Sequence, residues 1–138
     1  MLSQSIFKRA FITLAITGFL NFISMRFYLY WSFWWMDMIV HFFGGLTVSL
    51  ATLWVFSHLY GFKNWNTLRL ITVSLMGSIF IGVIWELFEL HFGITSLSDG
   101  VRYVTDTASD ISMDIVGGIV GFFYTLNLLK KTNKIINN

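Results

Sequence analysis

The chain contains no cysteine and no proline, and only 12% of its 138 residues are charged. Without cysteine it has neither disulfides nor thiolate ligands for a metal. Without proline, its apolar runs lack the residue that most strongly breaks helices. The low charge, together with 56% hydrophobic residues and a mean hydropathy of +0.71, excludes a water-soluble fold. We therefore expect a small all-α membrane protein.

Four apolar runs are each long enough to cross the hydrocarbon core of a bilayer, which takes about 20 helical residues. They lie at about residues 6–24, 37–58, 68–90 and 108–128. We predict a single transmembrane domain over residues 1–138, built as a four-helix bundle and followed by a polar tail at 130–138. No small-x-small cleavage site follows the first run, which favours an uncleaved helix over a signal peptide.

Lysine and arginine are distributed unequally between the two ends of the predicted bundle. Only Arg26 and Arg102 lie in the first and third loops. Because basic segments stay on the cytoplasmic side, both termini are predicted to be cytoplasmic in a multi-pass protein. The residues that mark this side are Lys8, Arg9, Lys63, Arg69, Lys130, Lys131 and Lys134.

An aromatic run precedes the second predicted helix, with Tyr28, Tyr30, Trp31, Trp34 and Trp35 in close succession. Amphipathic rings of this kind collect at the level of the lipid headgroups. The run is predicted to form an interfacial belt on the outer face of the membrane.

Six of the seven acidic residues lie inside or at the edges of the apolar runs, where such residues are rare. The predicted topology brings all six, and also His41, to the outer half of the membrane. Helical periodicity places the members of each helix on one face. The three sets are Asp37 with His41, Glu86 with Glu89, and Asp106 with Asp110 and Asp114.

Small residues continue each acidic face toward the middle of the membrane, as Gly44 and Gly45 do after His41. Gly82 precedes Glu86, and Gly117 follows Asp114 in the same way. Because small residues let helices approach closely in lipid, the acidic faces are predicted to point into the bundle.

Converging carboxylates with so few cations nearby require bound cations, shared protons, or both. Oxygen ligands with a single imidazole suit Mg²⁺, Mn²⁺, Ca²⁺ or a carboxylate-bridged iron pair better than structural zinc. We predict a hard divalent metal, and the number of ligands is compatible with two ions. The predicted ligands are Asp37, His41, Glu86, Glu89, Asp106, Asp110 and Asp114.

Three functions are consistent with such a site. The first is a metal-dependent hydrolase or transferase acting on a lipid headgroup or a lipid-linked envelope precursor, with Glu86 or Glu89 as general base and Arg102 on the substrate's phosphate. The second is a cation or proton transporter, for which four helices are few in a monomer, a shortage that a homo-oligomer would relieve. The third is an accessory protein with a structural metal site. The expected partner is membrane lipid, and no nucleic-acid surface is indicated.

The order of these motifs resembles a family of small bacterial inner-membrane proteins of the YjdF-like type and, more distantly, the VanZ-like proteins. The motifs are Asp37-x-x-x-His41-x-x-Gly44, Trp85-Glu86-x-x-Glu89 and Asp106-x-x-x-Asp110-x-x-x-Asp114-x-x-Gly117-x-x-x-Gly121. In VanZ-like proteins the positions of Glu89 and Asp114 are commonly amides, so the comparison favours the YjdF-like group. The resemblance implies a location in the bacterial cytoplasmic membrane and supports the site more than any particular reaction.

Overall fold

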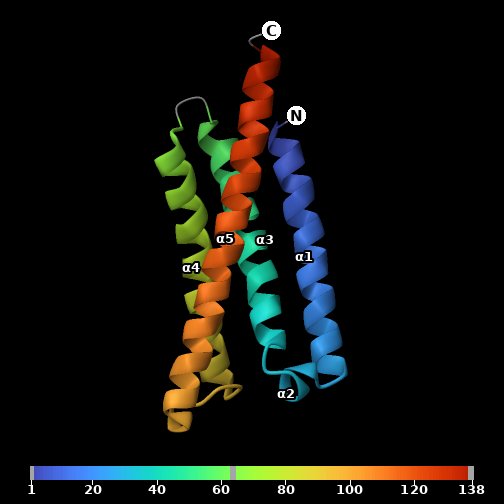
Figure 1. Ribbon diagram of the computed structural model, residues 1–138, viewed down its shortest axis with the longest axis vertical. Helices are drawn as coiled ribbons and strands as arrows, with labels where there is room; N and C mark the ends of the chain where they lie inside the picture. Colours follow the sequence, from blue (N-terminus) through green and yellow to red (C-terminus); the bar gives the residue numbers. More distant parts are fainter. Residues whose placement is uncertain (1, 63–64, 137–138) are drawn as a thin grey trace.

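The computed structural model of the chain describes residues 2–62 and 65–136, with side chains as far as Thr132. Within these residues every regular element is helical, and four helices are long and apolar enough to cross a membrane. The predicted all-α bundle of four spanning helices is thus confirmed. In chain order (Figure 1) the elements are α1 (Leu2–Arg26), α2 (Leu29–Ser32), α3 (Met36–Tyr60), α4 (Thr67–Phe92), the 3₁₀ helix η1 (Leu97–Asp99) and α5 (Val101–Ile136).

The last helix is longer than the sequence pattern predicts. It begins at Val101 instead of residue 108, and it continues to Ile136 through most of the predicted polar tail. Hydropathy marks only the apolar part of a helix, and the first turns of α5 carry the exposed Arg102 and Asp106. Among the residues used to predict orientation, Lys63 and the side chain of Lys134 lie outside the described part of the chain.

The two central helices are α3 and α5, which pack most extensively on each other. Helix α1 packs mainly on α3, whereas α4 contacts both α3 and α5. Figure 1 shows both chain termini at one end of the bundle, with α2 and the α4–α5 connection at the other. We call these the terminal end and the acidic end, because the acidic residues lie on the parts of α3, α4 and α5 nearest to α2 and η1.

Apolar side chains form the core of the terminal half. Ile6 and Ala10 of α1 pack with Leu50 of α3, and a second cluster joins Leu53, Leu70 and Phe122 from α3, α4 and α5. Many other apolar side chains, including Phe11 and Phe80, point outward and are more than half exposed. In a bilayer these outward rings contact acyl chains, so the apolar surface needs no further protein cover.

Hydroxyl groups and glycines hold the three helices α3, α4 and α5 together at mid-height. The Oγ atoms of Ser49 and Ser74 lie 2.6 Å apart, and both lie within hydrogen-bonding distance of the carbonyl oxygen of Gly118, at 3.2 and 2.8 Å. Ser78 donates to the carbonyl of Gly45 at 2.9 Å. These contacts need helix backbones in close approach, which the small residues permit.

The aromatic segment, residues 28–35, connects α1 to α3 at the acidic end. Tyr28 has a left-handed φ of 56°, which turns the chain into the single turn of α2. The side chains of Trp31 and Trp34 are 69% and 80% exposed. This exposure suits the predicted position at the headgroup level, where the rings meet both water and apolar chains.

Candidate metal centre

His41 lies in the second turn of α3, is 5% exposed, and is surrounded by carboxylates from three helices. Its Nδ1 is 3.1 Å from Oδ2 of Asp114, while its Nε2 is 3.8 Å from Oδ1 of Asp37 and 3.9 Å from Oε1 of Glu86. These residues together with Asp110 are called the His41 cluster below. Its members come from α3, α4 and α5, whose acidic faces therefore meet inside the bundle as the periodicity predicts.

Two glycines position Asp114 for its contact with His41. A Cβ atom on Gly45 would overlap the backbone of Asp114, and one on Gly82 would overlap its carboxylate. The absence of these Cβ atoms lets α5 lie against α3 and α4 at this height. Since Asp114 occupies Nδ1 of His41, the ring is oriented with Nε2 toward the other acids, as a carboxylate orients a metal-binding histidine.

Asp37, His41 and Asp110 are arranged as a group that can hold a metal ion. Each offers one ligand atom, and these atoms all lie within 4.8 Å of one another. Asp110 is 2% exposed, whereas the side chain of Asp37 is 27% exposed, so the group is reached from the acidic end. Two carboxylates and one imidazole form a donor set suited to a hard divalent cation.

Three buried atoms in the His41 cluster have no hydrogen-bond partner: Nε2 of His41, Oδ1 of Asp110 and Oε1 of Glu86. Buried polar atoms in proteins are nearly always paired, because leaving one unpaired costs about 1–3 kcal/mol. Their concentration around one imidazole makes the cluster the candidate ion site of the described residues.

The two glutamates of α4 have different surroundings, although they share a helix face. Oε2 of Glu86 accepts a 2.7 Å hydrogen bond from the hydroxyl of Thr107, which leaves Oε1 directed to His41. Glu89 instead accepts a 3.0 Å hydrogen bond from Nε1 of Trp85 on its own helix. Thr107 was not among the predicted site residues, although its position three residues before Asp110 would have placed it on the same face.

Replacing Thr107 with valine is expected to lower the free energy of unfolding by about 1–3 kcal/mol, because it removes the donor to a buried carboxyl group while preserving side-chain shape. The matched control is Thr105→Val. Thr105 is exposed on the same helix and donates only to backbone carbonyls of its own helix. Denaturant unfolding in detergent should show a change below about 0.5 kcal/mol for the control, and equal losses would contradict the role of Thr107.

The side chains of Asp106 and Arg102 are exposed near the start of α5. Among the hydrogen bonds and ion pairs of the described residues, none joins either side chain to the His41 cluster. Asp106 shares its helix face with Asp110 but lies one turn nearer the acidic end. The structure therefore brings together five of the predicted ligands, with Glu89 paired to Trp85 and Asp106 at the surface.

Tyr30 connects α2 to α1 at the acidic end. Its hydroxyl donates a 2.7 Å hydrogen bond to Oδ1 of Asn21. Burial, assisted by the neighbouring Asp37 carboxylate, raises the pKa of Tyr30 well above its usual range. The hydroxyl therefore keeps its proton and remains a donor.

The chain matches a known family model along most of its length. That model, described as "Predicted membrane protein (DUF2238)", covers residues 5–131, which include every member of the His41 cluster. Neither the curated proteins nor the solved structures contain a significant match. With its four membrane-spanning helices and this match, the chain belongs to the DUF2238 family of predicted membrane proteins.

Proposed function

We propose that Asp37, His41 and Asp110 bind a divalent metal ion and that the protein is a metal-dependent hydrolase or transferase. Its substrate would be a lipid headgroup or a lipid-linked envelope precursor. The observation that carries this proposal is the set of unpartnered buried atoms on His41, Asp110 and Glu86. The donor atoms favour Mg²⁺, Mn²⁺, Ca²⁺ or iron.

A metal ion in this position would polarise a phosphoryl or acyl oxygen and lower the pKa of a bound water. Glu86 is the proposed general base, since Thr107 fixes one of its oxygens and the other is unpartnered beside His41. Asp114 would hold the imidazole in place through Nδ1. Glu89 accepts a hydrogen bond from Trp85 and would stabilise this end of α4, without acting as the base that takes the proton of the water.

The position of the His41 cluster favours a substrate at the membrane surface. Asp37 lies in the first turn of α3, directly after the aromatic segment, and is the most exposed member of the metal-binding group. Arg102 is exposed at the same end, at the start of α5. We propose that Arg102 binds the phosphate of the substrate, because a guanidinium can donate two parallel hydrogen bonds to a phosphate.

A transport function has less support. On the terminal side of Asp114, the buried polar residues among those described are all serines and threonines, and the hydroxyls of Ser49, Ser74 and Ser78 are within hydrogen-bonding distance of backbone carbonyls. Hydroxyl groups engaged in this way offer no ionisable relay toward the terminal end. We also infer cytoplasmic termini and a bacterial inner membrane, and we place the chain with the YjdF-like proteins.

The proposal is tested by metal content and headgroup turnover in the same preparations. Wild-type protein purified in detergent should retain a divalent metal at a defined stoichiometry and hydrolyse or transfer the headgroup of a lipid substrate. Glu86→Gln should keep the metal and lose about 10²–10⁴-fold in turnover, the usual contribution of a general base. Asp99→Asn, an exposed acid in η1, is the control and should change neither.

Three results would contradict the proposed enzymatic function. Absence of bound metal after supplementation would refute the metal centre. Loss of metal, helicity and turnover together in Glu86→Gln would indicate a structural site. Movement of the metal or of protons into liposomes containing the protein, without lipid turnover, would indicate a transporter.

A further inference from the structure

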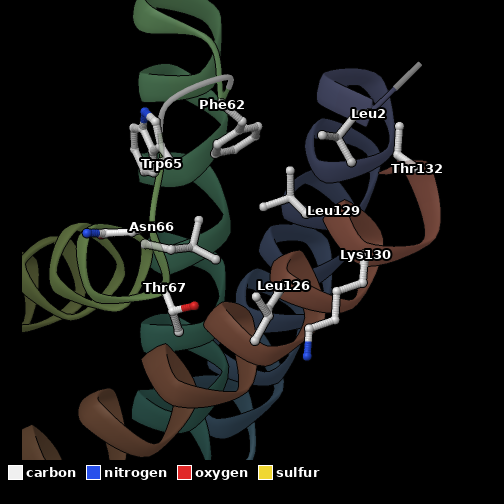
Figure 2. Close-up of a pocket in the computed structure, with 10 residues that line it drawn as sticks. Leu2, Phe62, Trp65, Asn66, Thr67, Leu126, Leu129, Lys130 and Thr132 are labelled. Atoms are coloured by element: carbon white, nitrogen blue, oxygen red, sulfur yellow. The ribbon is translucent and has the colours of Figure 1, made fainter. Parts of the chain in front are cut away.

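A cavity of about 400 Å³ lies at the terminal end, far from the His41 cluster. Figure 2 shows its lining residues, which come from α1, α4, α5 and the connection between α3 and α4. Phe62, Trp65, Leu126 and Leu129 supply apolar walls, while Lys130 supplies a cation. We call it the basic cavity. It combines a hydrocarbon-like surface with a charged group.

The surroundings of the basic cavity carry positive charge only. The sequence has no aspartate or glutamate before Asp37, between residues 38 and 85, or after Asp114. Arg69 is not a lining residue, but its guanidinium carbon lies 5.0 Å from the centre of the ring of Trp65, which does line the cavity. An anion bound here would therefore meet the Lys130 cation, with Arg69 adjoining the Trp65 wall, and no carboxylate from these stretches.

The first turn of α4 borders the same space. Thr67, the first residue of this 26-residue helix, lines the basic cavity, as does the N-cap residue Asn66. The Asn66 side chain accepts from the backbone N–H of Arg69 at 2.8 Å, so other N–H groups of the first turn remain for a ligand. The partial positive charge of a helix N-terminus adds to the attraction exerted by Lys130.

We propose that the basic cavity binds an anionic phospholipid, with its phosphate between Lys130 and the start of α4 and its apolar part against Phe62, Leu126 and Leu129. A free phosphate would use the cation but leave the apolar walls unoccupied. Basic pockets between membrane-spanning helices bind anionic headgroups through this combination of charge and apolar contact. The site is independent of the metal centre.

The test compares phosphatidylglycerol with phosphatidylcholine, each added to delipidated protein in detergent and followed by native mass spectrometry. One molecule of phosphatidylglycerol should bind per protein, with a higher affinity than phosphatidylcholine. Lys130→Gln should weaken phosphatidylglycerol binding about fivefold. Lys131→Gln is the matched control, because Lys131 is exposed on the next position of α5 and does not line the cavity. The Lys131→Gln variant should bind phosphatidylglycerol with the affinity of the wild type.

A second variant, Leu126→Trp, fills the cavity without changing charge and should abolish the bound phosphatidylglycerol while metal content stays constant. Equal binding of the two lipids would overturn the proposal, as would equal effects of the two lysine substitutions. Displacement of phosphatidylglycerol by an equal concentration of inorganic phosphate would show that the cavity recognises phosphate alone, and would also overturn it.

Discussion

Asp110→Asn is expected to lower the affinity of the protein for a divalent metal by more than about 100-fold. Loss of a residue that only orients a ligand typically costs 10–100-fold, and Asp110 is a proposed ligand itself. The residue is 2% exposed and its Oδ1 has no protein partner, so asparagine keeps the shape of the side chain while removing the charge that attracts a cation.

The expected affinities form a graded series that distinguishes ligand from support. Asp114→Asn should weaken metal binding by about 10–100-fold, because Asp114 contacts only Nδ1 of His41 in the metal-binding group. Asp99→Asn should leave binding unchanged. Titration calorimetry with Mn²⁺ measures all three, and circular dichroism checks that the helices remain. If the Asp110→Asn variant binds the metal with wild-type affinity, Asp110 is not a metal ligand.

Gly45→Ala is expected to lower the free energy of unfolding by about 3 kcal/mol or more. A Cβ at this position would overlap the carbonyl oxygen, Cα and carbonyl carbon of Asp114, which are backbone atoms and cannot rotate aside. Helices α3 and α5 would have to separate, which would also pull Asp114 away from His41. Thermal or denaturant unfolding should show the loss, accompanied by weaker metal binding.

Gly18→Ala is the matched control, since a Cβ on Gly18 would meet nothing within 4 Å and Gly18 also lies inside a spanning helix. It should be neutral or stabilising by up to about 1 kcal/mol, the difference in helix propensity. Gly82→Ala tests the intermediate case, because the atoms nearest to its Cβ would be side-chain atoms, the carboxylate of Asp114 and the end of Ile111, which can move aside more easily than backbone. Equal stability of all three variants would contradict the close approach of α3 and α5.

The four spanning helices were predictable because apolar length alone identifies them, and the observed bounds of α1, α3 and α4 extend those predictions by only a few residues at each end. The start of α5 was not predictable in this way. Its first turns carry Arg102 and Asp106, and a helix that extends beyond the apolar band leaves no hydropathy signal.

The candidate site was predictable as a set of inward faces, but not as a set of contacts. Periodicity fixes the direction of Asp37, His41 and Asp110 about their helix axes, whereas the relative height and rotation of the helices decide which atoms meet. That is why the pairing of His41 with Asp114 could not be foreseen. The different roles of Glu86 and Glu89 likewise depend on two separate donors, since Thr107 donates to Glu86 and Trp85 donates to Glu89.

The unequal lengths of the helices bear on how the protein responds to bilayer thickness. At 1.5 Å per residue, the 36 residues of α5 extend about 54 Å, against about 38 Å for the 25 residues of α3 and about 30 Å for the hydrocarbon core. With the aromatic segment at its predicted headgroup level, the acidic end would be anchored and hydrophobic mismatch would be taken up at the terminal end. A thicker or thinner membrane would leave the His41 cluster at constant depth and move the basic cavity relative to the opposite leaflet.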